Sequence, residues 1–152
     1  MIPNSLKINR GKRSLRDLAD FMIRRGYTRL IIIEGWKGNP RRLKFYSLLH
    51  GRLENEATIL LSGLSLQVDK KMNRKLKTLS IEDDGADTSK KLKEYIVDFL
   101  GSHYIIDPRR DGVDGKMLIR VIDGSLVIEF YGDRKDIIYP RIKVEKWFVN
   151  TK

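Results

Sequence analysis

The chain of 152 residues lacks cysteine altogether and has only two histidines. Without thiols it can form neither a disulfide framework nor a thiolate metal site. His50 and His103 stand far apart in the sequence, so a zinc site is not expected. We therefore predict a protein that works without a metal or other cofactor.

Long apolar runs are also missing. The apolar run of the first predicted strand covers only residues 30–33, far short of the roughly 18 residues of a membrane helix. The N-terminus lacks the apolar segment of a signal peptide. These absences predict a soluble protein of the cytoplasm without a membrane partner, and the length suits one compact domain.

Positive charge is what the chain has in excess, with a net charge of +11 at pH 7. Residues 1–81 contain 18 Lys and Arg and 6 Asp and Glu, a balance of +12, whereas residues 82–152 contain 13 and 14, a balance of −1. A basic half beside a neutral-to-acidic half is typical of polyanion binding, because each neutralised phosphate releases counterions. The alternative is a basic surface that only keeps the protein in solution.

Local patterns in the first half predict one helix and several strands. Ser14 and Asp17 form a helix start, apolar residues follow at helical spacing, and Gly26 supplies the stop. Strands are expected over residues 30–33, 42–48, 57–62 and 75–81, with residues 38–40 as a turn. The second of these strands has an apolar face of Leu43, Phe45 and Ser47 and a basic, aromatic face of Arg42, Lys44 and Tyr46.

The second half repeats this pattern loosely. Its acidic segment, residues 82–87, is interpreted as a loop or hinge, and a second helix is expected from residue 88 or 89 to Gly101. Further strands are expected over residues 104–106, 116–122, 126–131 and 141–148, with Asp123-Gly124 as a hairpin turn. A helix, a glycine, an isoleucine-rich strand and Pro-Arg-Arg occur in both halves, which suggests two similar α+β lobes; coincidence in a basic chain is the alternative.

The first candidate for a functional segment is residues 10–14 (RGKRS), directly before the first helix. Cations at a helix N-terminus oppose the macrodipole, so Lys12 and Arg13 would be favourable there if a phosphate met them and the free helix amides. Alternatively, both side chains simply extend into water.

The second candidate is the loop that follows the first predicted strand. Trp36 could stack on an unpaired base while Lys37, Arg41 and Arg42 meet phosphates, with Lys44 and Tyr46 extending the surface along the next strand. In the other interpretation Trp36 packs beneath the loop as a plug of the core, and the neighbouring asparagine and proline only turn the chain.

The third candidate is the carboxylate-rich loop of residues 107–115. Carboxylates can hold magnesium in a nuclease, yet this loop is rich in glycine and has arginines between its acids, and the calcium-loop pattern with a distal glutamate is absent. We interpret it as a series of turns. Because no serine or histidine constellation offers a nucleophile either, no catalytic residue is predicted.

Three blocks of the sequence resemble a known family. Residues 8–18 (INRGKRSLRDL), 37–40 (KGNP) and 139–144 (YPRIKV) are similar, in order and approximate spacing, to successive blocks of the Brix-domain family, specifically its short archaeal ribosome-biogenesis members. Only seven residues precede the first block, so the N-terminus is expected to be shortened relative to family members. Tyr139 stands where the family has glycine.

The resemblance implies a fold and a role. It implies a single Brix-like domain over residues 1–152, built of two similar halves that each resemble the anticodon-binding domain of certain aminoacyl-tRNA synthetases, a small mixed or antiparallel sheet with helix packing. It also implies a non-enzymatic role in ribosomal RNA processing and small-subunit assembly. The implied partners are RNA, specifically the small-subunit ribosomal RNA precursor, and other ribosome-assembly proteins.

The residues and the resemblance together predict an RNA-binding assembly factor. The predicted RNA-binding residues are Lys12, Arg13, Arg16, Trp36, Lys37, Asn39, Arg41, Arg42, Lys44, Arg141 and Lys143. The alternative is a protein-interaction module of a ribonucleoprotein assembly that does not bind RNA directly.

Overall fold

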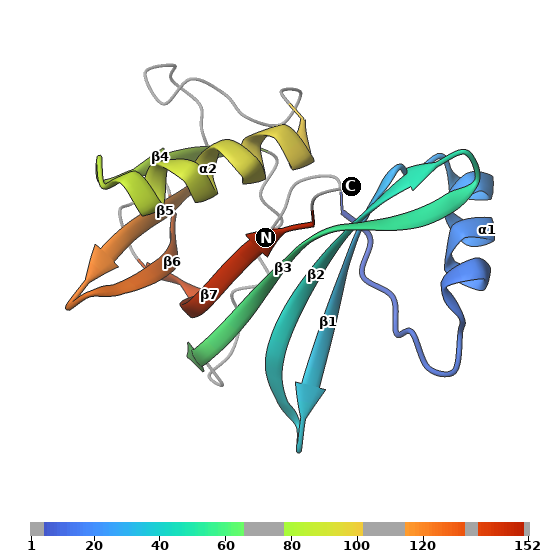
Figure 1. Cartoon of the computed structure of the whole chain (residues 1–152), viewed down its shortest axis with the longest axis horizontal. Coiled ribbons are helices and arrows are strands. Elements are labelled where there is room, and N and C mark those ends of the chain that lie inside the picture. Colours follow the sequence, from blue (N-terminus) through green and yellow to red (C-terminus); the bar gives the residue numbers. More distant parts are fainter. Residues whose placement is uncertain (1–4, 66–77, 102–114, 133–136, 151–152) are drawn as a thin grey trace. The chain divides into compact units, whose positions relative to one another are not determined.

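The computed structural model describes residues 5–65, 78–101, 115–132 and 137–150, except the side chains of residues 137–140. These ranges contain two helices and seven strands, so the predicted α+β class is confirmed (Figure 1). The elements are α1 (Leu15–Arg25), β1 (Arg29–Trp36), β2 (Asn39–Leu49), β3 (Arg52–Ser65), β4 (Leu79–Asp83), α2 (Asp87–Leu100), β5 (Gly115–Ile122), β6 (Ser125–Gly132) and β7 (Ile137–Val149).

The strands follow the order β1-β2-β3-β7-β6-β5-β4. The chain forms two compact units. The α1 unit comprises Leu6–Leu61 and Glu145–Lys152, and the α2 unit comprises Met1–Ser5 and Ser62–Val144. Strands β3 and β7 each contribute residues to both units. A single Brix-like domain of two similar halves stays a prediction.

Helix α1 begins and ends where the sequence predicts. The Ser14 hydroxyl accepts a hydrogen bond from the Asp17 backbone N–H (3.1 Å), and the Asp17 carboxylate accepts one from the Ser14 backbone N–H (3.0 Å). This reciprocal pair is a capping box. Gly26 follows the last turn with a φ of 76°, a left-handed conformation that glycine adopts without steric cost.

The α1 unit contains an antiparallel sheet of β1, β2 and β3. Ile32 of β1 and Tyr46 of β2 are buried with Leu18 of α1 in one cluster, so the helix covers this part of the sheet face. Tyr46 was expected on the exposed basic face and is instead only 7% exposed, because α1 packs over it. On the opposite face of β2, Phe45 and Ser47 are buried as predicted.

The turn between β1 and β2 lies earlier in the chain than predicted. Lys37 and Gly38 have φ values of 50° and 81°, and two successive positive φ values match the twist of paired strands in a type I′ hairpin. Asn39 and Pro40 are therefore the first residues of β2, where they pair with the end of β1. This turn closes the hairpin that points downward in Figure 1.

The α2 unit combines a parallel and two antiparallel strand pairs. Strand β4 runs parallel to β5, and the β5–β6 and β6–β7 pairs are antiparallel. Helix α2 packs against β4 and β5 and buries Leu92, Ile96 and Phe99. The predicted hairpin turn at Asp123 and Gly124 is confirmed, with φ values of 50° and 78°.

The acidic segment of residues 82–87 is a loop only in part. Strand β4 includes its first two residues and Asp87 begins α2, so the prediction of a loop or hinge over the whole segment is wrong. The Asp84 carboxylate accepts hydrogen bonds from the Val121 backbone N–H in β5 (2.8 Å) and from the N-cap residue of α2 (3.0 Å). The hydrogen bond from the Val121 backbone, and after it the one from the N-cap residue, lower the pKa of Asp84 because they stabilise the charged carboxylate.

Some predictions fall outside the described residues. They are the strand over residues 104–106, the second Pro-Arg-Arg at residues 108–110, and the acidic loop up to residue 114.

Candidate nucleic-acid interface

The tip of the β1–β2 hairpin presents an exposed tryptophan among cations. Trp36 is the last residue of β1 and is 67% exposed, so it does not plug the core. Lys37 occupies the turn, and Arg41 and Arg42 follow on β2, with all three exposed. An aromatic ring open to solvent beside positive charge is the combination that binds an unpaired base and its phosphates.

A β-bulge sets the spacing of the arginines at this tip. Glu34 pairs with Arg42 and Gly35 pairs with Pro40, so Arg41 is the extra residue of the bulge. The two strands approach each other so closely that a Cβ on Gly35 would lie 2.9 Å from a backbone oxygen of β2. A side chain at position 35 would therefore displace the strand that carries both arginines.

The same residues line a hollow of about 660 Å³. Its lining consists of Glu34, Gly35, Trp36, Arg41 and Arg42. A hollow bordered by an aromatic ring, two guanidinium groups and one carboxylate offers both stacking and charge to a nucleotide.

Glu34 moderates the charge of this surface. Its Oε1 atom lies 3.2 Å from Lys44 Nζ, and its Oε2 atom lies 3.9 Å from Arg42 Nε. One carboxylate thus offsets part of the charge of two cations and limits where they reach. In the described part of the chain Lys37 and Arg41 have no ion-pair partner, so the tip keeps a surplus of positive charge.

The cations before α1 are exposed, but the helix start is already capped by the chain itself. Hydrogen bonds from Ser14, helped by the positive charge of Arg13 and Arg16, lower the pKa of Asp17. This carboxylate supplies the negative charge that the helix macrodipole favours. The cations therefore do not require a phosphate to explain their placement, and phosphate binding by Lys12 and Arg13 stays a prediction.

Arg13 is further oriented by an aromatic ring. Its guanidinium carbon lies 5.8 Å from the centre of the Phe21 ring, and that of Arg25 lies 5.5 Å from the same ring. A ring attracts cations at such distances. This contact draws Arg13 toward the side of α1 that carries Phe21.

Helix α1 and the ion pair of Glu34 and Lys44 lie on one face of the sheet. Side chains alternate along a strand, so Glu34 lies on the same face as Ile32, and Lys44 lies on the same face as Tyr46. Ile32 and Tyr46 pack against α1. Nine of the predicted RNA-binding residues, from Lys12 to Lys44 in sequence, belong to the α1 unit.

The other two predicted residues, Arg141 and Lys143, lie on β7 within the α2 unit. Both are exposed. The backbone oxygen of Lys143 accepts a hydrogen bond from the Ser62 hydroxyl (3.4 Å), which fixes the strand beneath its side chain. Arg141 has an ion-pair partner that the sequence did not reveal.

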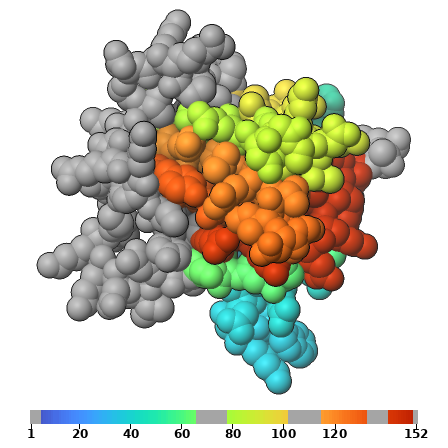
Figure 2. All heavy atoms as spheres, turned by 90° about the vertical axis from the view of Figure 1, so that its left-hand side faces the viewer, coloured from blue at the N-terminus to red at the C-terminus, as the bar shows by residue number. Residues whose placement is uncertain are grey.

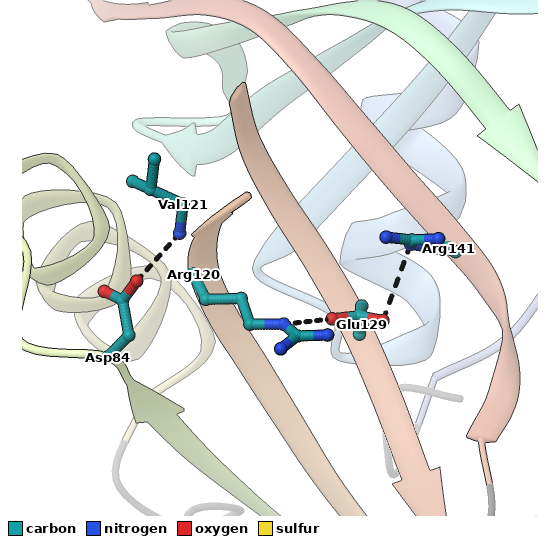
Figure 3. Close-up of polar contacts among 5 residues, drawn as sticks. All are labelled: Asp84, Arg120, Val121, Glu129 and Arg141. Carbon is teal, nitrogen blue, oxygen red and sulfur yellow. Dashed lines mark hydrogen bonds and ion pairs between the residues drawn. The ribbon is translucent and has the colours of Figure 1, made fainter. Parts of the chain in front are cut away.

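That partner is Glu129, a buried carboxylate of β6 that also binds Arg120 of β5 (Figure 3). Neither Glu129 nor Arg120 was predicted from the sequence as a candidate site residue. The available signal was the single acid inside the otherwise apolar run of residues 126–131. The pKa of Arg120 is raised, chiefly because its side chain donates a hydrogen bond to Glu129, so this guanidinium remains charged.

The described residues contain no group of three or more His, Asp or Glu placed to hold a metal ion. Among them, no helix has the length and the apolar character to cross a membrane.

The fold and its cationic surface define an α+β protein with a basic hairpin, and comparison with known proteins narrows this class. No family model matches the chain. A probable Brix domain-containing ribosomal biogenesis protein from Sulfurisphaera tokodaii is 34% identical over 105 residues, which cover 69% of this chain and 57% of that protein. The protein with the same description from Thermococcus kodakarensis is 49% identical over 45 residues, covering 30% of this chain and 22% of that protein.

Solved structures show the same fold. A probable ribosomal biogenesis protein from Aeropyrum pernix superposes with a TM-score of 0.79 at 20% identity, covering 95% of this chain and 82% of the other. Mil, an archaeal Imp4-like protein, gives a TM-score of 0.68 at 21% identity, covering 98% and 85%. The sequence identity to the curated proteins makes the chain a homologue of archaeal Brix domain-containing ribosomal biogenesis proteins, and the predicted resemblance is confirmed. The aligned segments span between about a fifth and three fifths of the length of the curated relatives.

Proposed function

We propose that this chain is a non-catalytic ribosome biogenesis factor that binds ribosomal RNA during small-subunit RNA processing and assembly. The names of its curated relatives support the role in ribosome biogenesis. The single observation that carries RNA binding is the hairpin tip, where Trp36 is 67% exposed beside Arg41 and Arg42.

The chemistry of the tip suits an unpaired nucleotide. Sequence-tolerant stacking of a base on an aromatic side chain contributes about 1–3 kcal/mol, and Trp36 has the open ring that stacking needs. Lys37 and Arg41 lack ion-pair partners among the described residues, so their charge is available to phosphates. Arg42 and Lys44 add positive charge, and their ion pairs with Glu34 orient their side chains.

The RNA that this chain binds is the precursor of small-subunit ribosomal RNA, and other ribosome-assembly proteins are further partners. The two halves of the chain resemble anticodon-binding domains. Lys12, Arg13, Arg16 and Asn39 extend the RNA contact in the α1 unit. Arg141 and Lys143 supply a contact from the α2 unit.

Equilibrium binding across a salt series tests this proposal. The probes are a structured fragment of small-subunit ribosomal RNA and an unrelated RNA of equal length. Affinity for the ribosomal fragment should fall steeply with salt and exceed that for the unrelated RNA, because phosphate contacts release counterions and the RNA shape adds preference. Equal binding to both would reduce the claim to a generic basic surface, and binding to neither would refute it.

A protein-interaction module is the second candidate function. Strand β1 ends the strand order and carries Ile33, which is 63% exposed. A terminal strand with an exposed apolar side chain can accept a partner strand by β-augmentation. This alternative predicts a partner interaction that is insensitive to salt and an absence of RNA affinity.

A further inference from the structure

Glu129 is a charged residue in the interior of the α2 unit. It is 1% exposed and lies in the middle of β6. Burying a carboxylate is costly unless it is paired and hydrogen-bonded. Arg120 and Arg141 provide the pairing from the two strands beside β6, as Figure 3 shows.

Each arginine uses the same atom to meet this carboxylate. Arg120 Nε donates to Glu129 Oε1 at 2.5 Å, and Arg141 Nε lies 3.5 Å from Oε2. Binding through Nε leaves the terminal amino groups at the far end of each guanidinium. In the described part of the chain these amino groups donate no hydrogen bond, and the two side chains are 39% and 45% exposed.

The strand register adds a third cation. Val127 of β6 pairs with Arg120 on one side and with Lys143 on the other, so these three residues form one row across β5, β6 and β7. Glu129 lies two residues further along β6, on the same face as Val127. Arg120 and Arg141 contact this carboxylate, and Lys143 lies in the neighbouring row on the same face, so three cations lie near one buried anion.

A hollow of about 290 Å³ adjoins this cluster. Arg141 and Lys143 line it together with the polar residues Ser65, Ser125 and Asp123. In Figure 2 the end of β3 (green) lies beside the orange and red atoms of β6 and β7. Arginine, lysine and hydroxyl groups are the usual protein ligands of phosphate oxygens.

We infer that Glu129 is a positioning residue that holds Arg120 and Arg141 as a clamp for a backbone phosphate of RNA, with Lys143 as an additional cation. This inference rests on the proposed function and adds Arg120 and Glu129 to the RNA contact. A guanidinium held by its Nε presents two parallel N–H groups, which match two phosphate oxygens. The buried carboxylate restricts the rotation of both side chains before RNA arrives.

The substitution Glu129→Gln separates positioning from simple electrostatics, because the two explanations predict opposite signs. Removing one negative charge should tighten RNA binding if only net charge matters. Loss of the carboxylate that orients two arginines should instead weaken binding by about tenfold, the value of one charge-assisted hydrogen bond. The matched control is Glu94→Gln on α2, which makes the same change of charge at an exposed site.

The double variant Arg120→Lys/Arg141→Lys covers the case in which Glu129→Gln does not fold. It keeps both charges but removes the planar fork, so it should also bind RNA about tenfold more weakly, with an unchanged circular dichroism spectrum. The assay measures binding to the small-subunit ribosomal RNA fragment at moderate salt.

Weaker binding by Glu129→Gln, with Glu94→Gln at or above wild-type affinity, supports the clamp. If both variants bind as tightly as the wild type or more tightly, the clamp is refuted while the proposed function stands. Wild-type affinity of the double lysine variant would refute the clamp as well. No RNA binding by the wild-type chain would overturn the proposed function and the clamp together.

Discussion

Replacing Trp36 with alanine should weaken RNA binding while leaving the fold nearly intact. Fully burying a large apolar side chain stabilises a protein by about 1.5–3 kcal/mol. Trp36 is 67% exposed, so about a third of that value, roughly 0.5–1 kcal/mol, is lost on truncation. Loss of one stacked base should cost about 1–3 kcal/mol of binding free energy, which corresponds to a 5- to 150-fold weaker affinity.

Intrinsic fluorescence provides the assay. The chain has two tryptophans, and the substitution Trp147→Phe leaves Trp36 as the single tryptophan emitter. RNA stacking should quench this emission as binding saturates, whereas Trp36→Phe should retain most of the affinity because it keeps an aromatic ring. Urea unfolding of Trp36→Ala measures the accompanying change in stability.

Two outcomes would refute the reasoning about Trp36. Wild-type affinity of Trp36→Ala would show that the ring does not contact RNA. A loss of unfolding free energy well above 1 kcal/mol would show that the ring is packed in the folded protein, in conflict with its exposure.

Three further predictions concern the α1 unit. Charge reversal at Arg41 and Arg42 should weaken RNA binding and lower the slope of log affinity against log salt by about 1.4, since each single-strand phosphate contact contributes about 0.7. Gly35→Ala should lower the free energy of unfolding by about 1–3 kcal/mol in urea, because the new Cβ would lie 2.9 Å from a backbone oxygen. Asp17→Asn should reduce stability at neutral pH but not near pH 2. The folded-state pKa of Asp17 is lowered from 3.8, so its contribution is present above that value and is lost as the pH falls through the folded pKa.

Each of these predictions has a control or a contradicting result. Charge reversal at Lys90 and Lys91, which are exposed on α2, makes the same change of net charge and should reduce affinity less. An equal effect of both double variants would contradict a specific role of the hairpin. Gly35→Ala with unchanged stability would mean that the hairpin relaxes freely, and an equal stability gap for Asp17→Asn at pH 2 and pH 7 would contradict the capping-box linkage.

The sequence predicts the elements whose cause is local. Both ends of α1 could be predicted because Ser14, Asp17 and Gly26 act through their own side chains or backbone freedom. The Asp123-Gly124 turn follows for the same reason. By contrast, the Lys37-Gly38 turn was predicted one residue too late, at residues 38–40, and the His50-Gly51 turn was not predicted, although both adopt positive φ values. Their first residues are not the asparagine or aspartate that favour this conformation.

The candidate site depends on the register in which the strands pair, and this register cannot be deduced from the sequence. Glu34 meets Lys44 because β1 and β2 pair in a register that a bulge shifts by one residue. Arg120, Glu129 and Arg141 come from three strands and meet only when the α2 unit is assembled. Residue types and local spacing therefore indicated a basic surface. The ion pairs that orient its side chains could be identified only from the folded structure.

Crosslinking of the purified chain to total archaeal RNA, followed by sequencing of the bound RNA, tests the central claim most directly. The account predicts that precursors of small-subunit ribosomal RNA are enriched over their abundance, and that Trp36→Ala reduces this enrichment. Crosslinked RNA that mirrors the composition of the input, with the same yield for Trp36→Ala, would contradict it.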